Sequence, residues 1–97
     1  MEDDEQATNG FQKTSLEEQA ILTLRPNPTN GELQVTITGS SIEEVIVYDV
    51  VGKELMRVSA VHSQQTTINV ELLHSGIYFL KIVAEDGIQH TKKIIKR

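Results

Sequence analysis

Three histidines, His62, His74 and His90, are the first residues whose chemistry could support metal binding or base catalysis. They lie 12 and 16 residues apart, and no carboxylate stands at ligand spacing from any of them. Metal ligands are usually three or four residues apart on a helix, or two apart on a strand, so that they converge on one point. We therefore expect surface or loop histidines, with no metal site and no cofactor.

Asp49 is the remaining candidate for a catalytic acid. A catalytic carboxylate needs a partner and a pocket, and no histidine or serine stands near Asp49 in the sequence. An aspartate that accepts hydrogen bonds from turn amides needs neither, and Gly52 follows at turn distance. The chain also has no cysteine and no nucleophile-elbow, zincin, phosphate-loop or dinucleotide-binding motif. These observations predict no catalytic residues and a protein that is not an enzyme.

The segment Thr91–Arg97 concentrates positive charge, with four cations around two isoleucines. Lysines on an edge strand deter sheet-to-sheet aggregation, which is one interpretation. The other is a docking strand, whose cations steer it toward an acidic partner and whose free edge another chain could extend. An unpaired edge would also allow two copies to form a dimer. Composition alone favours the first interpretation.

Length and charge distribution restrict the remaining classes. The 97 residues carry a formal net charge of −5 and are 38% hydrophobic, which fits one small domain. No uninterrupted apolar run exceeds four residues, so we expect no membrane insertion. Residues 1–20 alone carry a net −5, while residues 21–97 are balanced, which argues against nucleic-acid binding. We interpret 1–20 as a flexible acidic linker or cleavage region and 21–97 as the folded domain.

Short β-type runs separated by turn signals fill residues 21–97. Alternating apolar and polar residues, or short apolar runs, predict strands over 21–24, 33–38, 44–50, 53–61, 66–72, 77–84 and 88–96. Val45, Ile46 and Val47 are consecutive, which indicates a central strand that is covered on both faces or lies at a sheet-to-sheet contact. Leu72 continues the alternation of the fifth run. Asp86-Gly87 predicts a type I′ turn that pairs the last two strands. The pattern favours an all-β, seven-stranded antiparallel immunoglobulin-like β-sandwich, with a small barrel as the alternative.

Four segments together resemble a known family. Pro26-Asn27-Pro28-Thr29-Asn30-Gly31, Val47–Lys53, Leu73–Ile82 and Lys92–Lys96 occur in the order found in type A C-terminal sorting domains of the type IX (Por) secretion system. The resemblance covers about Leu22 to Arg97. Arg25 departs from the pattern, because the family usually has an aromatic residue before the prolines.

The resemblance implies a secretion signal on a longer cargo protein. Its partners would be the parent cargo, an outer-membrane translocon and a surface sortase of the cysteine-peptidase type, which removes the domain. The cargo would pass through the periplasm and reach the cell surface or the medium. The residues implied in translocon recognition are Lys92, Lys93, Ile94, Ile95, Lys96 and Arg97. Those expected to determine the fold are Pro26, Asn27, Pro28, Gly31, Asp49, Gly52, Gly76, Tyr78 and Gly87.

A second function class stays open at this stage. A β-sandwich could instead be an adhesion or carbohydrate-binding module that is retained on a secreted enzyme. Only fold analogy supports this alternative, and two Phe and two Tyr supply few aromatic rings for a sugar-binding platform.

Overall fold

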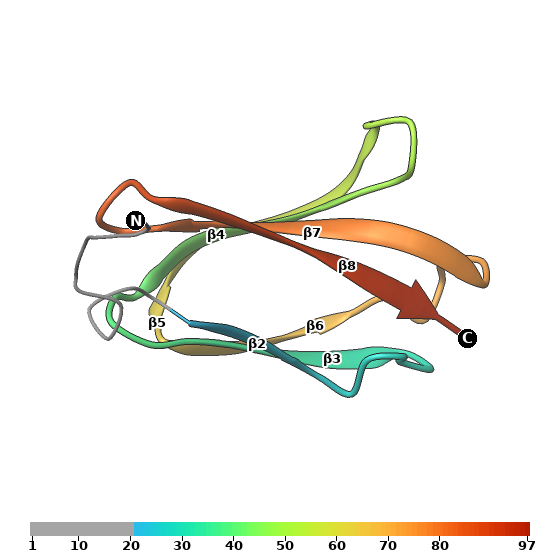
Figure 1. Cartoon of the computed structure of the whole chain (residues 1–97), viewed down its shortest axis with the longest axis horizontal. Coiled ribbons are helices and arrows are strands. Elements are labelled where there is room, and N and C mark those ends of the chain that lie inside the picture. The colour runs from blue at the N-terminus through green and yellow to red at the C-terminus, as the bar shows by residue number, and fades with distance from the viewer. Residues whose placement is uncertain (1–20) are drawn as a thin grey trace, which may run out of the picture.

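The computed structural model describes residues 21–97, and these residues form seven strands and no helix. A three-stranded sheet has the order β2-β3-β6 and a four-stranded sheet the order β5-β4-β7-β8, with every pairing antiparallel (Figure 1). The prediction of seven strands in an all-β domain is confirmed. The predicted linker over 1–20 lies outside the described residues. The strands are β2 (Leu22–Arg25), β3 (Glu32–Ile37), β4 (Ile42–Tyr48), β5 (Glu54–Ser63), β6 (Gln65–Asn69), β7 (Gly76–Ala84) and β8 (Gln89–Lys96).

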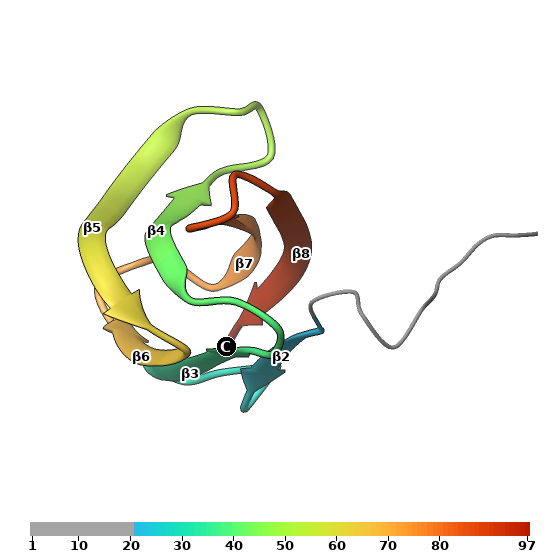
Figure 2. The same cartoon turned by 90° about the vertical axis from the view of Figure 1, so that its left-hand side faces the viewer.

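The two sheets face each other across one apolar core, which Figure 2 shows in a view along the strands. On β3 every second side chain is buried, at Leu33, Val35 and Ile37, as the alternating sequence predicts. Side chains from both sheets join the same cluster, and each fully buried aliphatic residue contributes about 1.5–3 kcal/mol of burial free energy. Among residues 21–97, no helix is long and apolar enough to cross a membrane.

Strand β4 lies inside the larger sheet and is apolar on both faces. Val45, Ile46 and Val47 are all at most 2% exposed. Val45 and Val47 belong to the core, whereas Ile46 points to the outer face, where Arg57 and Lys81 are its cross-strand partners. The prediction of a strand covered on both faces is therefore confirmed.

The hairpin of β7 and β8 pairs as the sequence predicts, but its turn is of another type. Ile77 lies opposite Ile95, and Val83 lies opposite Gln89. The Gly87 amide donates to the carbonyl of Ala84 and the Ala84 amide to that of Ile88, so the loop has three residues. Gly87 has a positive φ, whereas Asp86 does not. The predicted type I′ turn is wrong, because that turn needs positive φ at both central residues.

Strand β6 ends earlier than its apolar pattern predicts. The side chain of Asn69 accepts a hydrogen bond from the Glu71 amide at 2.8 Å, and the Leu73 amide donates to the carbonyl of Val70. These bonds close a turn directly after Asn69. Leu72 was predicted to lie on the buried face of this strand and is instead 96% exposed. The hydrogen bond to the Asn69 side chain therefore ends the strand, although the alternation of apolar and polar residues continues past it.

Candidate docking face beside the C-terminal residues

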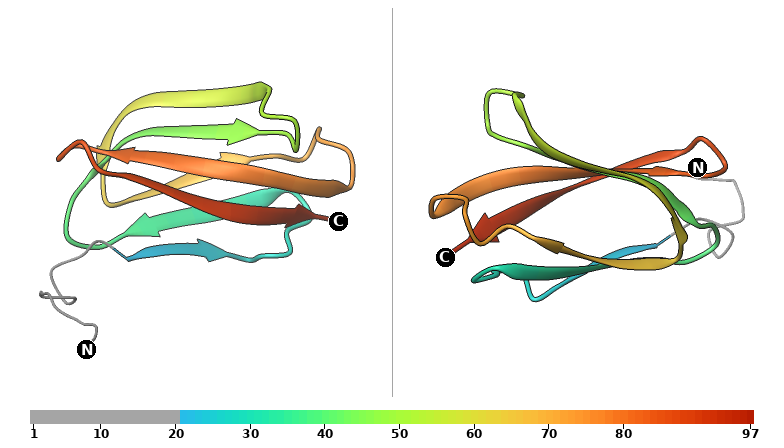
Figure 3. Two further views of the ribbon diagram at one scale, coloured as in Figure 1. Left: turned by 45° about the horizontal axis from the view of Figure 1, so that its top comes forward. Right: turned by 180° about the vertical axis from the view of Figure 1, so that it is seen from behind.

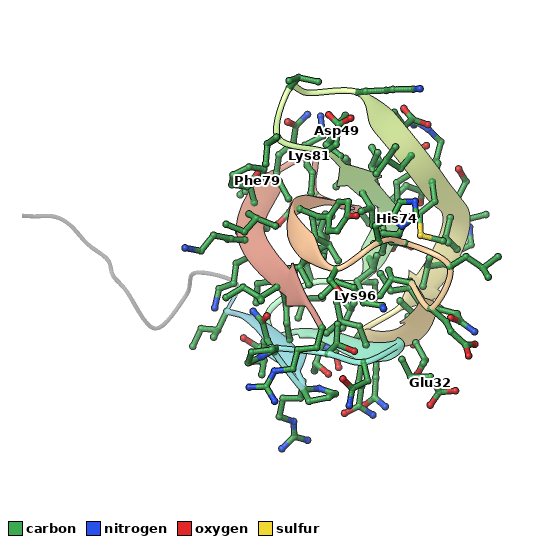
Figure 4. The ribbon with its side chains drawn as sticks, turned by 90° about the vertical axis from the view of Figure 1, so that its right-hand side faces the viewer. Glu32, Asp49, His74, Phe79, Lys81 and Lys96 are labelled. Atoms are coloured by element: carbon green, nitrogen blue, oxygen red, sulfur yellow. The ribbon has the colours of Figure 1, made fainter. Side chains whose placement is uncertain are left out.

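Four separate segments of the chain lie together at one end of the two sheets. Because neighbouring strands are antiparallel, the connections after β2, β4 and β6 and the end of β8 all lie at this end, on the right in Figure 1. We call it the terminal face and define it as residues 26–31, 49–53, 70–75 and 96–97. Each of the four sequence segments that carry the family resemblance reaches this face. Figure 4 looks onto it, with Lys96 near the middle and Asp49, His74 and Glu32 around it.

The connection between β2 and β3 binds the end of β8 directly. The Asn27 side-chain amide donates to the carbonyl of Lys93 at 3.0 Å, and its side-chain oxygen accepts from the Ile95 amide at 3.0 Å. The Thr29 amide donates to the carbonyl of Ile95, and the Arg97 amide donates to the carbonyl of Thr29. Figure 3 shows the end of β8 beside this connection. The outer edge of β8 is therefore occupied from Lys93 to Arg97.

This contact corrects the prediction of a free terminal edge. Another chain cannot extend β8 at Lys93–Arg97 without displacing Asn27 and Thr29, because each of those backbone groups already has a partner. Within residues 21–97, no backbone hydrogen bond covers the outer edge of residues 89–92. A dimer through an edge strand stays a prediction, and on β8 it would use that first half.

Thr29 is a residue of the terminal face whose structural role the sequence did not predict. Its side chain is 1% exposed, and its hydroxyl donates to the Glu32 carbonyl at 2.6 Å while accepting from the Gly31 amide at 3.1 Å. With its backbone bonded to β8, all polar groups of this buried residue are satisfied. The only available signal was a small hydroxyl residue inside a proline-asparagine turn.

Replacing Asn27 by alanine is expected to loosen the end of β8 while leaving its beginning intact. The substitution removes two hydrogen bonds and leaves the Ile95 amide without a protein partner, at about 1–3 kcal/mol. Native-state hydrogen exchange should report faster exchange for Ile95 and unchanged exchange for Leu80, a buried residue of β7. The matched control is Asn30→Ala, an exposed asparagine of the same connection. Equal exchange at Ile95 in all three proteins would contradict this role.

The six residues implied in recognition divide into two groups in the structure. Ile94 is 1% exposed and lies in the core, and Lys96 is 8% exposed, with its ammonium group 2.9 Å from the main-chain oxygen of Arg97. The remaining four lie at the surface and can contact a partner without unfolding: Lys92, Lys93, Ile95 and Arg97. The segment for which the resemblance implies recognition therefore combines two buried side chains with four exposed ones.

The residues expected to determine the fold lie mainly in turns. Asp49 accepts hydrogen bonds from the amides of Val51 and Lys53, at 3.0 and 2.8 Å, so the predicted turn acceptor is observed. Gly52 follows with φ 91°, where a side chain would be strained. Gly76 begins β7, and the Tyr78 hydroxyl donates to the carbonyl of His74 at 2.7 Å. In the β2–β3 connection, the peptide bonds before Pro26 and Pro28 are both cis, and the carbonyl of Gly31 accepts from the Val70 amide.

Apolar side chains also gather on the terminal face. Val50, Val51 and Leu72 are 65%, 84% and 96% exposed. Leu72 borders a groove of about 520 Å³ between the start of β5 and residues 69–73. The face thus presents exposed apolar side chains together with the exposed cation Arg97. The groove is lined by Leu55, Met56, Asn69, Val70, Glu71, Leu72 and Leu73.

The histidines do not share a site, but one of them has carboxylate neighbours that the sequence spacing conceals. His62 Nδ1 lies 2.6 Å from Glu85 and 3.5 Å from Glu43. The hydrogen bond to Glu85 and then the charge of Glu43 raise the pKa of His62 above its ordinary value. His62 is a surface histidine, as predicted, and strand pairing places beside it two carboxylates that are distant in the sequence.

The other two histidines stay apart from this group. His74 is exposed, as predicted, and its carbonyl receives the hydroxyl of Tyr78. His90 is half-buried on β8, and its Nε2 is buried without a hydrogen-bond partner among residues 21–97. His90 is thus only partly at the surface, with its Nε2 turned away from solvent.

Comparison with known proteins identifies the family. The family model described as "Secretion system C-terminal sorting domain" matches residues 23–97. The chain belongs to this family. The sorting domain therefore acts as a C-terminal signal of type IX secretion, part of a cargo that is exported across the outer membrane to the surface or the medium. The proposed resemblance is confirmed, and the match includes all four segments on which it was based.

The sorting domain was also compared with curated proteins and with solved structures. No curated protein matches it in sequence. The crystal structure of CopC from Methylosinus trichosporium OB3b is similar, with a TM-score of 0.48 and 16% identity, over 78% of this chain and 89% of that one.

Proposed function

We propose that the sorting domain is a folded recognition tag whose terminal strand is held in shape for the export machinery. The family match over residues 23–97 carries this proposal. The buried side chains of Ile94 and Lys96 would hold the end of β8 in place, while Lys92, Lys93 and Arg97 lie at the surface. A rigid strand presents its cations at a smaller entropic cost than a disordered tail would.

The electrostatics favour an acidic partner on the outer-membrane translocon. Four of the eight cations of residues 21–97 are in the last six positions. Clustered charges steer encounter and exclude like-charged surfaces. The apolar side chains of Val50, Val51 and Leu72 on the terminal face would then add contact area.

The domain organisation completes this proposal. Residues 1–20 would be the accessible linker in which a surface sortase cleaves, after the cargo has passed through the periplasm. Exposed linkers next to tightly folded domains are preferred protease substrates. The domain itself would have no catalytic activity and would serve as a signal that is recognised and then removed.

The arrangement of strands supports an immunoglobulin-like sandwich. The first, second and fifth described strands share one sheet, and the third, sixth and seventh share the other. Constant-type immunoglobulin domains divide their strands in the same way, with one exception. Their fourth strand lies in the sheet of the first, second and fifth strands, whereas here the fourth described strand, β5, lies in the other sheet. The bond from Tyr78, near the start of the sixth described strand, to the carbonyl of His74 resembles the tyrosine corner of that fold.

Mass spectrometry of the mature secreted cargo tests this function. We expect the new C-terminus of the cargo to lie within residues 1–20 or upstream of them, with residues 21–97 absent. A module for adhesion or carbohydrate binding would instead stay attached, so full retention of residues 21–97 on surface-delivered cargo would contradict the proposal. Cargo from cells with an inactivated sortase is the control and should keep the domain.

A further inference from the structure

Three potential metal ligands meet at the end of the domain opposite the terminal face. Glu43 is on β4, His62 is near the end of β5, and Glu85 directly follows β7. His62 Nδ1 is 2.6 Å from Glu85 Oε2 and 3.5 Å from Glu43 Oε1. One nitrogen and two carboxylate oxygens lie within 4.8 Å of one another. This end is on the left in Figure 1, where β7 connects to β8.

An irregularity in the larger sheet brings the three side chains together. The register of β4 shifts between Ile42 and Glu44 against both β5 and β7, which leaves Glu43 without a directly opposed residue. On β5, Ala60 and His62 have φ angles of 57° and 53°, which L-residues other than asparagine and aspartate rarely adopt. Bulges of this kind redirect side chains out of the regular alternation. The backbone therefore turns His62 toward the two glutamates.

The donor set suits a transition metal better than calcium or magnesium. Imidazole nitrogen binds zinc, copper and nickel, whereas calcium and magnesium prefer oxygen ligands alone. With zinc–ligand bonds of about 2.0–2.2 Å, tetrahedral ligands lie roughly 3.4 Å apart. The 3.5 Å separation between His62 Nδ1 and Glu43 is close to that value. The 2.6 Å separation between His62 Nδ1 and Glu85 is that of a hydrogen bond, which would have to open by about 0.8 Å as the ion replaces the shared proton.

We propose that Glu43, His62 and Glu85 bind a divalent transition-metal ion, for which zinc is the test ion, with a fourth position open to water. The ion would join β4, β5 and β7 and would stabilise the folded domain by mass action. The side chains of His62 and Glu85 are 63% and 40% exposed, which gives the ion direct access from solvent. The site lies away from the terminal face and does not depend on the proposed recognition function.

Titration of the 97-residue chain with zinc chloride at neutral pH tests the site. Calorimetry should detect one bound ion, and the nitrogen chemical shifts of the His62 ring should move first in nuclear magnetic resonance spectra. The substitutions His62→Ala and Glu85→Gln should each weaken binding by at least about tenfold. His74→Ala is the matched control, because it removes an exposed histidine outside the cluster and should leave the affinity unchanged.

A melting experiment separates a specific site from adventitious binding. Saturating zinc should raise the melting temperature of the unmodified chain and of His74→Ala, but not that of His62→Ala. Spectra without zinc establish that each variant is folded. Absence of zinc binding, equal affinity in His62→Ala, or first shifts at His74 or His90 would each overturn the proposal.

Discussion

Replacing Ile94 by alanine is expected to reduce the free energy of unfolding by about 2–5 kcal/mol, because the side chain is fully buried between the sheets. Domains of this size have only about 5–15 kcal/mol in total. The loss is therefore a large fraction of the total free energy of unfolding. Urea denaturation followed by circular dichroism gives the change directly.

Ile95→Ala provides a matched control for Ile94→Ala. Ile95 is the adjacent residue of the same strand and has the same side chain, but it points to the outer face and is 38% exposed. Its truncation should cost at most about 1 kcal/mol. Equal losses at the two positions would show that the terminal strand is not anchored through Ile94.

Deleting Lys92–Arg97 from the full cargo should abolish surface delivery and leave the cargo in the periplasm. The deletion removes the buried Ile94 side chain and the β8 partners of residues 76–80 of β7. It also removes the exposed cations, so recognition and folding are lost together. Protease accessibility on intact cells, with cell fractionation, measures the delivered fraction.

Ile94→Ala in the same cargo separates the two effects of the deletion. That variant loses stability but keeps all four terminal cations. If recognition depends on the cations, its folded fraction should still be delivered, whereas the deletion variant should not. Normal surface delivery of the deletion variant would contradict the role assigned to the terminal strand.

The strands could be predicted from the sequence because their signals are local. Alternation at Leu33, Val35 and Ile37 reports a strand with one buried face, and this pattern does not depend on what the strand pairs with. Leu72 shows the limit of that reasoning. Its alternation continues past Asn69, whose side chain closes a turn, so a local hydrogen bond determines where the strand ends.

The contacts of the terminal face depend on pairs of residues that are distant in the sequence. Asn27 meets Lys93 and Ile95, which are 66 and 68 positions away. Likewise, His62 meets Glu43 and Glu85 only because β4, β5 and β7 are neighbours with shifted register. Sequence spacing cannot reveal such contacts, because the order of strands in a sheet determines them.

The surface delivery of a folded charge-reversal variant is the most direct test of the account. Lys92→Glu/Lys93→Glu changes two exposed cations of the terminal strand and leaves Ile94 and Lys96 intact. Thr23→Glu/Arg25→Glu/Gln64→Glu makes the same total change in charge at three exposed positions outside β8 and outside the terminal face. Both variants should keep their stability, since surface substitutions usually change it by about 0.5 kcal/mol or less.

We expect the variant of the terminal strand to lose at least about tenfold in the surface-delivered fraction of cargo, while the control variant keeps delivery close to that of the unmodified domain. Equal delivery of the two variants, with both domains folded, would contradict recognition through the terminal cations.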